Sequence, residues 1–349
     1  MLIYILITIL ILLFRGMLVT INTPDYYRKK ERQYSIVLYA ILIFISAVRS
    51  QTVGADTPGY VSEYINIHQY NFQDLLVEYK DFEGFYILAW ICKLLHFPVQ
   101  LWLGIVATLY IVPVAALINK YSTDKLYSIM CFFLMGAFTF SLAGLKQSVA
   151  MGMSIMAYLC IIEKRYLYTI LFGIFAFLCH KTSIIFLFAF PIYYLRNNRY
   201  FYAIVISMSA LILVYHRELL IYMTETINDQ RYMAYLNSSR SYSAVTLIYY
   251  LLMLSMPFLL SYKNNSRFLN SNKVLFGMSA MCTSFQSFAF VSPSAFRLAL
   301  YFLPFFGIYI PNILVGRYSN FIKVGIMLML IFYFFYTGRH SQYHFFWEM

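Results

Sequence analysis

Long apolar segments separated by polar turns fill most of the chain, and they set the strongest limit on its fold. They lie at about 2–21, 34–48, 84–97, 99–118, 126–143, 145–162, 166–179, 182–195, 200–215, 244–262, 273–291, 295–315 and 320–337. Many approach the roughly 20 apolar residues that a membrane-spanning helix needs, and they lack the alternating pattern of barrel strands. Only 11% of the residues are charged, whereas a soluble domain carries about 25%. The sequence therefore predicts an all-α, polytopic integral membrane protein.

The positions of lysine and arginine predict which loops face the cytoplasm, because such loops carry an excess of basic residues. The loop between the first two apolar segments is expected there because it contains Arg28, Lys29, Lys30 and Arg32. The later basic loops also fall on the cytoplasmic side if the short segment 84–97, about 21 Å long as a helix, is a re-entrant or interfacial helix and does not cross the membrane. This interpretation gives about 12 crossings, both termini outside, and one integral membrane domain with outer loops at about 49–83 and 217–243.

The start of the chain, its net charge and its cysteines each have a simple explanation. The first apolar run lacks the basic start and small-residue cleavage site of a signal peptide, so we expect it to be retained as a span. The formal charge of +12 follows mostly from topology, so no nucleic-acid partner is predicted. The five cysteines lie in or beside apolar segments without a CxxC pair, which indicates packing residues and neither a zinc site nor a disulfide framework.

The stretch RSQTVGADTPGY, residues 49–60, follows an apolar segment and combines charge with turn residues. Gly54 and the Pro58-Gly59 pair predict a loop. Arg49 and Asp56 form either an interfacial ion pair that ends the span or part of a catalytic loop at the membrane surface. Glu83, at the start of the next apolar segment, either stabilises a helix N-terminus or points into a cavity.

Three further motifs place polar side chains at outer ends of predicted spans. Lys146-Gln147 is either a snorkelling lysine with its neighbour or a cation and amide that face a phosphate-bearing ligand. His180-Lys181 interrupts two apolar segments, and histidine can accept a proton near neutral pH. Arg297 needs a counter-charge or water, and its guanidinium would suit a pyrophosphate.

The loop 217–243 contains acids, arginines such as Arg240, and tyrosines. This mixture suits sugar hydroxyls and rings or a lid over a site, and it suits a plain surface loop equally well. The sequence contains no P-loop and no GxGxxG motif, which argues against nucleotide-driven transport.

Taken in order, these motifs resemble the EpsG family, a Wzy-like group of bacterial exopolysaccharide and capsule repeat-unit polymerases. The resemblance covers roughly residues 49–305, and lysine stands at position 146 where the family usually has arginine. The matching residues are Arg49, Val53-Gly54-Ala55-Asp56-Thr57, Tyr60, Glu83-Gly84-Phe85, Leu145-Lys146-Gln147, Ala150, His180-Lys181-Thr182-Ser183-Ile184-Ile185, Arg297 and Tyr301-Phe302.

The resemblance implies a GT-C-like helical bundle in the bacterial cytoplasmic membrane. It implies that oligosaccharide repeat units on undecaprenyl diphosphate are joined on the outer face into a growing polysaccharide. Membrane lipid would contact the bundle. The sequence leaves open whether a co-polymerase partner sets the chain length.

The chemistry of such a donor fits the motif residues. A departing lipid diphosphate gathers negative charge, which Arg49, Lys146 and Arg297 would stabilise in a low-dielectric site. His180 is the first candidate for the base that takes the acceptor's proton, with Asp56 and Glu83 behind it. No metal and no cofactor are predicted. The remaining candidates for binding diphosphate or sugar are Gln147, Tyr60, Lys181 and Arg240.

Two functions from other classes use similar features. A flippase for lipid-linked oligosaccharides would also need interior cations, but distributed through the membrane depth, whereas these collect at one predicted face. A membrane acyltransferase that modifies surface sugars could use His180 as its base.

Overall fold

The computed structural model describes residues 1–227, 244–260, 272–314, 319–337 and 342–348. Within these residues 83% helix and no strand are found, and one isolated backbone bridge joins Arg49 to Phe345. The predicted all-α class is confirmed. All five cysteines are buried, in agreement with their predicted packing role.

Backbone contacts group the chain into two compact units. The first comprises residues 1–184 and 321–349, and the second comprises residues 185–320. The first contains α1 (Leu2–Val19), α2 (Pro24–Val48), α3 (Thr57–Asn66), α4 (Phe72–Glu78), α5 (Glu83–Leu94), α6 (Val99–Tyr121), α7 (Lys125–Leu134), α8 (Ala137–Ser141), α9 (Leu145–Ile162), α10 (Tyr166–Cys179) and nearly all of α19 (Ser319–Thr337).

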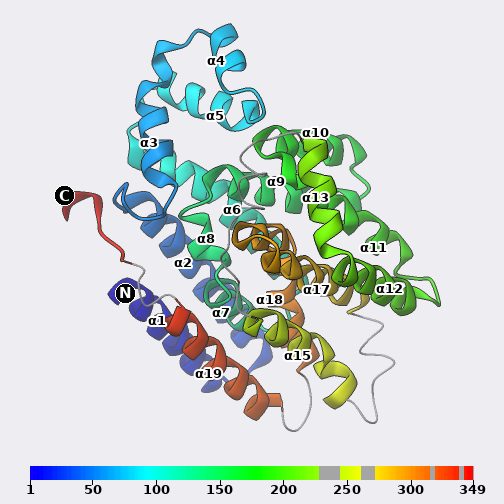
Figure 1. Cartoon of the computed structure of the whole chain (residues 1–349). Coiled ribbons are helices and arrows are strands. Elements are labelled where there is room, and N and C mark those ends of the chain that lie inside the picture. Colours follow the sequence, from blue (N-terminus) through cyan, green and yellow to red (C-terminus); the bar gives the residue numbers. More distant parts are fainter. Residues whose placement is uncertain (228–243, 261–271, 315–318, 338–341, 349) are drawn as a thin grey trace. The chain divides into compact units, whose positions relative to one another are not determined.

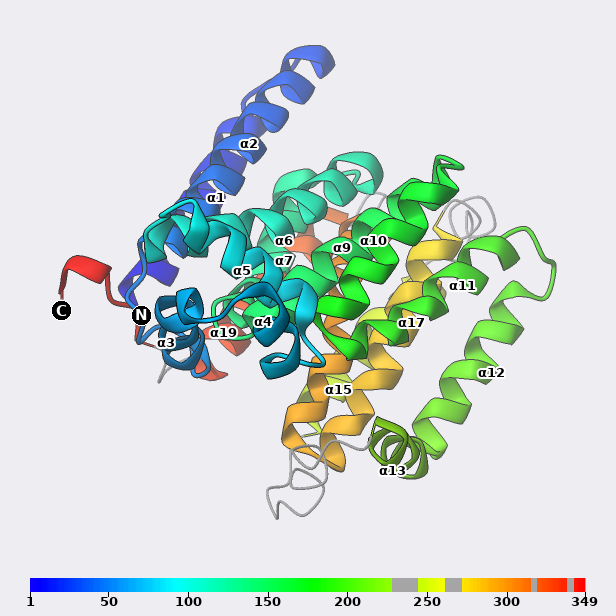
Figure 2. The ribbon, with the colours of Figure 1, turned by 90° about the horizontal axis from the view of Figure 1, so that it is seen from above.

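Helix α9 lies at the centre of the first unit, where it packs against α6 and α10 (Figure 2). It is the most buried of the long apolar helices, with 78% of its apolar window inside the protein. Gly152 makes the crossing with α6 close, because a Cβ atom there would lie 2.0 Å from the carbonyl oxygen of Leu109. That oxygen belongs to the backbone and has little freedom to move.

Replacement of Gly152 by alanine is therefore expected to lower the free energy of unfolding by about 2 kcal/mol, the range typical of overpacking. The matched control is Gly173→Ala in α10, where a new Cβ has no atom within 4 Å and where alanine favours helix. Thermal unfolding in detergent should show a lower Tm for the first variant and an equal or higher Tm for the second. Equal stability of the two variants would contradict the close crossing.

The second unit is built around α17 (Lys273–Gln286), which packs against α12 (Phe201–Val214), α15 (Val245–Leu260) and α18 (Leu303–Ile313). Several of its apolar segments are broken. The 3-10 helix η2 (Lys181–Phe188) leads into α11 (Ala189–Leu195), and the 3-10 helix η4 (Pro293–Tyr301) leads into α18 with a bend of 57°. A bend of 77° separates α12 from α13 (His216–Ile227).

Four helices in the described residues are long and apolar enough to cross a membrane, or up to six if each bent pair is one span. The four are α1, α2, α6 and α9. The chain is thus rich in membrane-type helices as predicted, but the number of about 12 crossings is not confirmed. The reason is visible in α7, which ends after Leu134 where Gly136 adopts a positive φ of 87°, so the apolar segment 126–143 forms two short helices.

The predicted outer loop 49–83 folds into the short helices α3 and α4, which gather with α5 at one end of the first unit (Figure 1). Its apolar side chains divide between inside and outside. Ile67 and Leu75 are fully buried, whereas Ile65 and Phe72 are 45% and 47% exposed. Helix α5 is too short to be among the candidate spans, and the interpretation of 84–97 as a re-entrant or interfacial helix stays a prediction.

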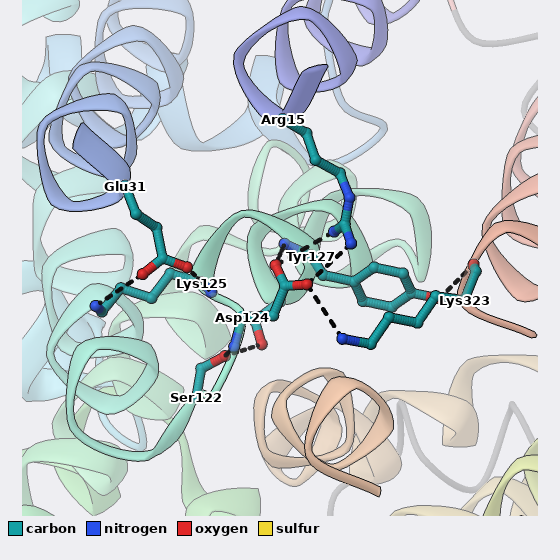
Figure 3. Close-up of polar contacts among 8 residues, drawn as sticks. Arg15, Glu31, Ser122, Asp124, Lys125, Tyr127 and Lys323 are labelled. Carbon is teal, nitrogen blue, oxygen red and sulfur yellow. Dashed lines mark hydrogen bonds and ion pairs between the residues drawn. The ribbon is translucent and has the colours of Figure 1, made fainter. Parts of the chain in front are cut away.

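A network of charges joins helices of the first unit at the N-terminal end of α2 (Figure 3). Arg15 donates from Nη2 and Nη1 to the two Asp124 carboxylate oxygens at 2.9 and 3.2 Å, and Lys323 Nζ lies 3.3 Å from the same carboxylate. Glu31, which is 4% exposed, pairs with Lys125 at 3.2 Å. Arg15 lies within the apolar segment 2–21, and the Asp124 carboxylate compensates its charge.

Candidate functional site

The RSQTVGADTPGY stretch is fixed against the turn that precedes α9. Gly54 has a φ of +99°, and a Cβ atom there would lie 2.3 Å from the carbonyl oxygen of Leu142. Thr57 Oγ1 donates to the same oxygen at 2.7 Å, and Arg49 Nη2 donates to it at 3.2 Å. The loop therefore sets the position at which α3 begins relative to α9.

Arg49 is almost completely enclosed. The residue is only 1% exposed. Its Nη1 donates to the Ser46 carbonyl at 2.6 Å, and its Nε makes no hydrogen bond. The C-terminal segment lies across this point, because Ser50 N donates to the His344 carbonyl at 2.8 Å and Tyr343 Oη donates to the Ile45 carbonyl at 2.7 Å. The guanidinium thus joins the end of α2 to the turn before α9, and its burial leaves no open face toward a ligand in this conformation.

Lys146, in the first turn of α9, lies among three aromatic rings that we call the Lys146 cage: Tyr60, Phe82 and Tyr86. Its Nζ is 5.1, 4.1 and 5.0 Å from these ring centroids, respectively. It also donates to Tyr86 Oη at 3.1 Å. Each ring attracts the cation through its quadrupole, so the cage holds a positive charge at a defined point.

A carboxylate completes this cluster, because Tyr86 Oη donates to Glu63 Oε2. Tyr60 and Glu63 are three residues apart in α3, so one helix face presents both. The ring of Tyr79 stacks on Tyr86 at 3.7 Å. Burial, followed by the charge of Glu63, raises the pKa of Tyr79 to about 12, so this phenol keeps its proton at neutral pH.

Gly84 brings the cage next to His180. A Cβ atom on Gly84 would lie 2.9 Å from Leu178 Cβ, so only glycine lets α5 pass this close to the end of α10. His180 caps the C-terminus of α10 with extended backbone. Its ring centroid is 5.7 Å from that of Phe82 in the cage, and its Nδ1 lies 2.6 Å from Thr182 Oγ1.

Three more charged residues of this region stabilise the turn before α5. Lys181 pairs with Asp81, whose backbone has a positive φ of 90°. Glu83 Oε1 accepts the Asp81 N–H at 3.2 Å. Glu83 therefore stabilises the turn and the N-terminus of α5, the first of the two alternatives that the sequence left open.

Three other predicted site residues belong to the start of α3, to α9 and to η4, and a fourth lies outside the described residues. Asp56 is the half-buried N-cap residue of α3, and Gln147 is 3% exposed within α9. Arg297 is half-buried in η4 of the second unit. Arg240 lies outside the described residues.

Sequence reasoning missed Glu63, Phe82 and Tyr86. The spacing of Tyr60 and Glu63 on one helix face was the available signal for Glu63. Phe82 and Tyr86 flank Glu83 and Gly84, but only the fold brings their rings to Lys146. Together the cluster provides a fixed cation, a carboxylate, phenol hydroxyls and a histidine within one unit. Such side chains can stabilise an anionic leaving group and can take up or give a proton during a transfer reaction.

Comparison with known protein families identifies the family to which the chain belongs. The sequence model of the EpsG family matches residues 32–348. The match includes the loop of Arg49, all members of the Lys146 cage, His180 and Arg297. Neither the curated proteins nor the solved structures contain a match to the chain.

Proposed function

Because the chain belongs to the EpsG family, we propose that it polymerises oligosaccharide repeat units carried on undecaprenyl diphosphate into a surface polysaccharide. Family membership and the apolar helices support a membrane protein of polysaccharide biosynthesis. On this proposal, an acceptor hydroxyl attacks the first sugar of a donor unit at the outer face of the bacterial cytoplasmic membrane. The glycosidic bond forms as the bond to diphosphate breaks.

The Lys146 cage is the observation that carries this proposal. The Lys146 amine donates to Tyr86 Oη at 3.1 Å, which fixes its position beside the three rings. A fixed cation aimed at the position where charge develops stabilises the departing diphosphate without reorganisation. The three rings attract the amine and hold it in place.

Arg49 and Arg297 take different parts in this proposal. Arg49 is a positioning residue, because its hydrogen bonds to the Ser46 and Leu142 carbonyls fix the loop that leads to Tyr60. Arg297 remains the second proposed cation for the diphosphate, and guanidinium geometry suits that ligand. The polar residues Gln147, Lys181 and Arg240 remain proposed contacts to sugar or diphosphate.

His180 is the proposed base that removes the acceptor's proton. Its Nδ1 lies within hydrogen-bond distance of Thr182 Oγ1, at 2.6 Å, and this contact fixes the orientation of the ring. Asp56 and Glu83 are weaker candidates, and Glu83 is already bound to the Asp81 N–H. We propose that the reaction uses no metal and no cofactor, since the leaving group's charge is met by side chains.

The direct test is to incubate the purified full-length chain in detergent with a lipid-linked repeat unit isolated from the producing bacterium. A ladder of products that differ by one repeat unit is expected on a gel. Appearance of the lipid-linked unit on the far side of proteoliposomes without a ladder would instead identify a flippase. Acyl groups on an otherwise unchanged glycan would identify an acyltransferase.

A further inference from the structure

A row of aromatic rings leads from the Lys146 cage to the surface of the first unit. We call Tyr70, Phe72, Tyr79 and Trp90 the aromatic strip. Tyr79 stacks on Tyr86 of the cage with ring centroids 3.7 Å apart and planes 20° apart. Tyr70 meets Tyr79 edge-on at 5.7 Å, and Phe72 lies 5.8 Å from Trp90. Trp90 Nε1 donates to the Tyr70 carbonyl at 3.2 Å, which closes the row.

These rings are not core residues. Phe72 is 47% exposed, and Tyr70, Tyr79 and Trp90 are half-buried. They come from α4, from the segments that flank it and from α5, so the row is held by several elements. Partly exposed aromatic rings in a continuous row indicate a surface that contacts something else.

The charge of the same region indicates the chemistry of that contact. Residues 56–83 contain six of the chain's 14 acidic residues and a single lysine, Lys80, although the whole chain has a net charge of +12. Asp74 and Glu78, beside the strip, are exposed. Anionic lipid headgroups attract basic segments, so an acidic lobe is unsuited to resting on an anionic membrane surface.

Carboxylates and aromatic faces together suit a carbohydrate. Carboxylate oxygens accept hydrogen bonds from hydroxyl groups, and the C–H face of a sugar ring packs against an aromatic ring, which combines an apolar body with a polar edge in tyrosine and tryptophan. Neither feature requires a charged ligand. The strip also runs directly into the proposed transfer site through the Tyr79–Tyr86 stack.

We propose that the aromatic strip binds the oligosaccharide portion of the substrate, so that successive sugars lie along Phe72, Trp90, Tyr70 and Tyr79 toward Lys146. This inference rests on the proposed polymerase function and adds to it a subsite that holds glycan during repeated transfer. Loss of the strip would weaken glycan binding and shorten the polymer, while leaving the transfer groups in place.

The test uses Phe72→Ala and Trp90→Leu in the full-length chain, with Tyr166→Ala as the matched control, because Tyr166 is an aromatic residue 56% exposed on α10 outside the strip. The probe is the delipidated repeat oligosaccharide released by mild acid from the bacterium's own lipid-linked precursor. Its dissociation constant is measured by calorimetry. Both strip variants are expected to bind it at least about tenfold more weakly, and the control should bind it as the wild type does.

A second readout separates this inference from the proposed function. The strip variants should join the first two lipid-linked units with a raised KM but with a kcat at saturating substrate within about twofold of wild type, and they should give shorter ladders. Phe72→Tyr keeps the ring and should restore the long products.

Unchanged glycan affinity in both strip variants would overturn the inference even if the wild type makes a ladder. Loss of binding to phosphatidylglycerol vesicles with unchanged glycan affinity would likewise overturn it and identify a membrane anchor. Glycan binding without any ladder from the wild type would refute the polymerase and retain the subsite.

Discussion

Replacement of Lys146 by alanine is expected to lower the rate of repeat-unit polymerisation about 100-fold or more. Removal of one preorganised donor to a developing negative charge typically costs about 10²–10³ in rate, and Lys146 is the cation at the centre of the cage. Initial rates with the purified chain and the lipid-linked repeat unit give the measurement. In cells that lack the native gene, the surface polymer should collapse to single units retained on the lipid.

Two control variants separate charge from packing. Lys146→Arg keeps the charge, although the larger planar group fits the three rings differently, so partial activity is expected. Lys93→Ala removes another lysine of the first unit that lies over an aromatic ring, 5.5 Å from the centroid of Tyr64, and it should keep near-normal rates. Normal polymer from Lys146→Ala at normal protein levels would refute the proposed site.

Tyr86→Phe offers a finer comparison within the cage. It retains the ring at 5.0 Å from the Lys146 amine but removes the hydroxyl that joins Lys146 to Glu63. If orientation of the amine matters as well as its charge, this variant should lie between wild type and Lys146→Ala in rate. The substrate KM should change less than kcat, because the amine acts mainly on the charge that develops during transfer.

The sequence was sufficient for local inferences at the site and insufficient for long-range ones. Within one motif, Gly54 predicted a turn that the structure contains, whereas the Pro58-Gly59 pair, also predicted as loop, lies in the first turn of α3. The meeting of Tyr60, Phe82 and Lys146 depends on how α3, α5 and α9 pack, and such pairings leave no periodic trace in a single chain. Two glycines were the available signal for such packing, because Gly54 and Gly84 lie where the backbone passes close to distant segments.

The helical class was predictable for a simple reason, whereas the breaks in the helices were not. Low charge and long apolar runs require helices in a membrane. The same runs do not record whether the backbone stays straight. Segment 182–195 forms a 3-10 helix followed by a short α-helix, and segment 295–315 bends by 57°. Both segments look like uninterrupted spans in composition.

Replacement of Asp124 by alanine is expected to lower the free energy of unfolding by about 2 kcal/mol, because loss of one partner from a partly buried ion pair leaves the other charges less well compensated. Asp124 has a side chain 13% exposed and receives Arg15 at 2.9 Å and Lys323 at 3.3 Å. It also caps α7 by accepting the Tyr127 N–H at 3.1 Å. Removal would therefore weaken the joint among α1, α7 and α19 and the start of α7 together (Figure 3).

The Asp124 effect can be divided by its controls. Asp124→Asn retains an N-cap acceptor and loses the charge, so its deficit measures the ion pairs, whereas the further deficit of Asp124→Ala measures the cap. Glu163→Ala breaks the Lys120 pair at 3.0 Å, in which the two side chains are 35% and 45% exposed, and such surface pairs contribute little to stability. Unfolding in mixed micelles gives all three values. A wild-type unfolding curve for Asp124→Ala would mean that Arg15 and Lys323 find water or other partners at no cost, and the network would then have no role in holding the first and last helices of the first unit together.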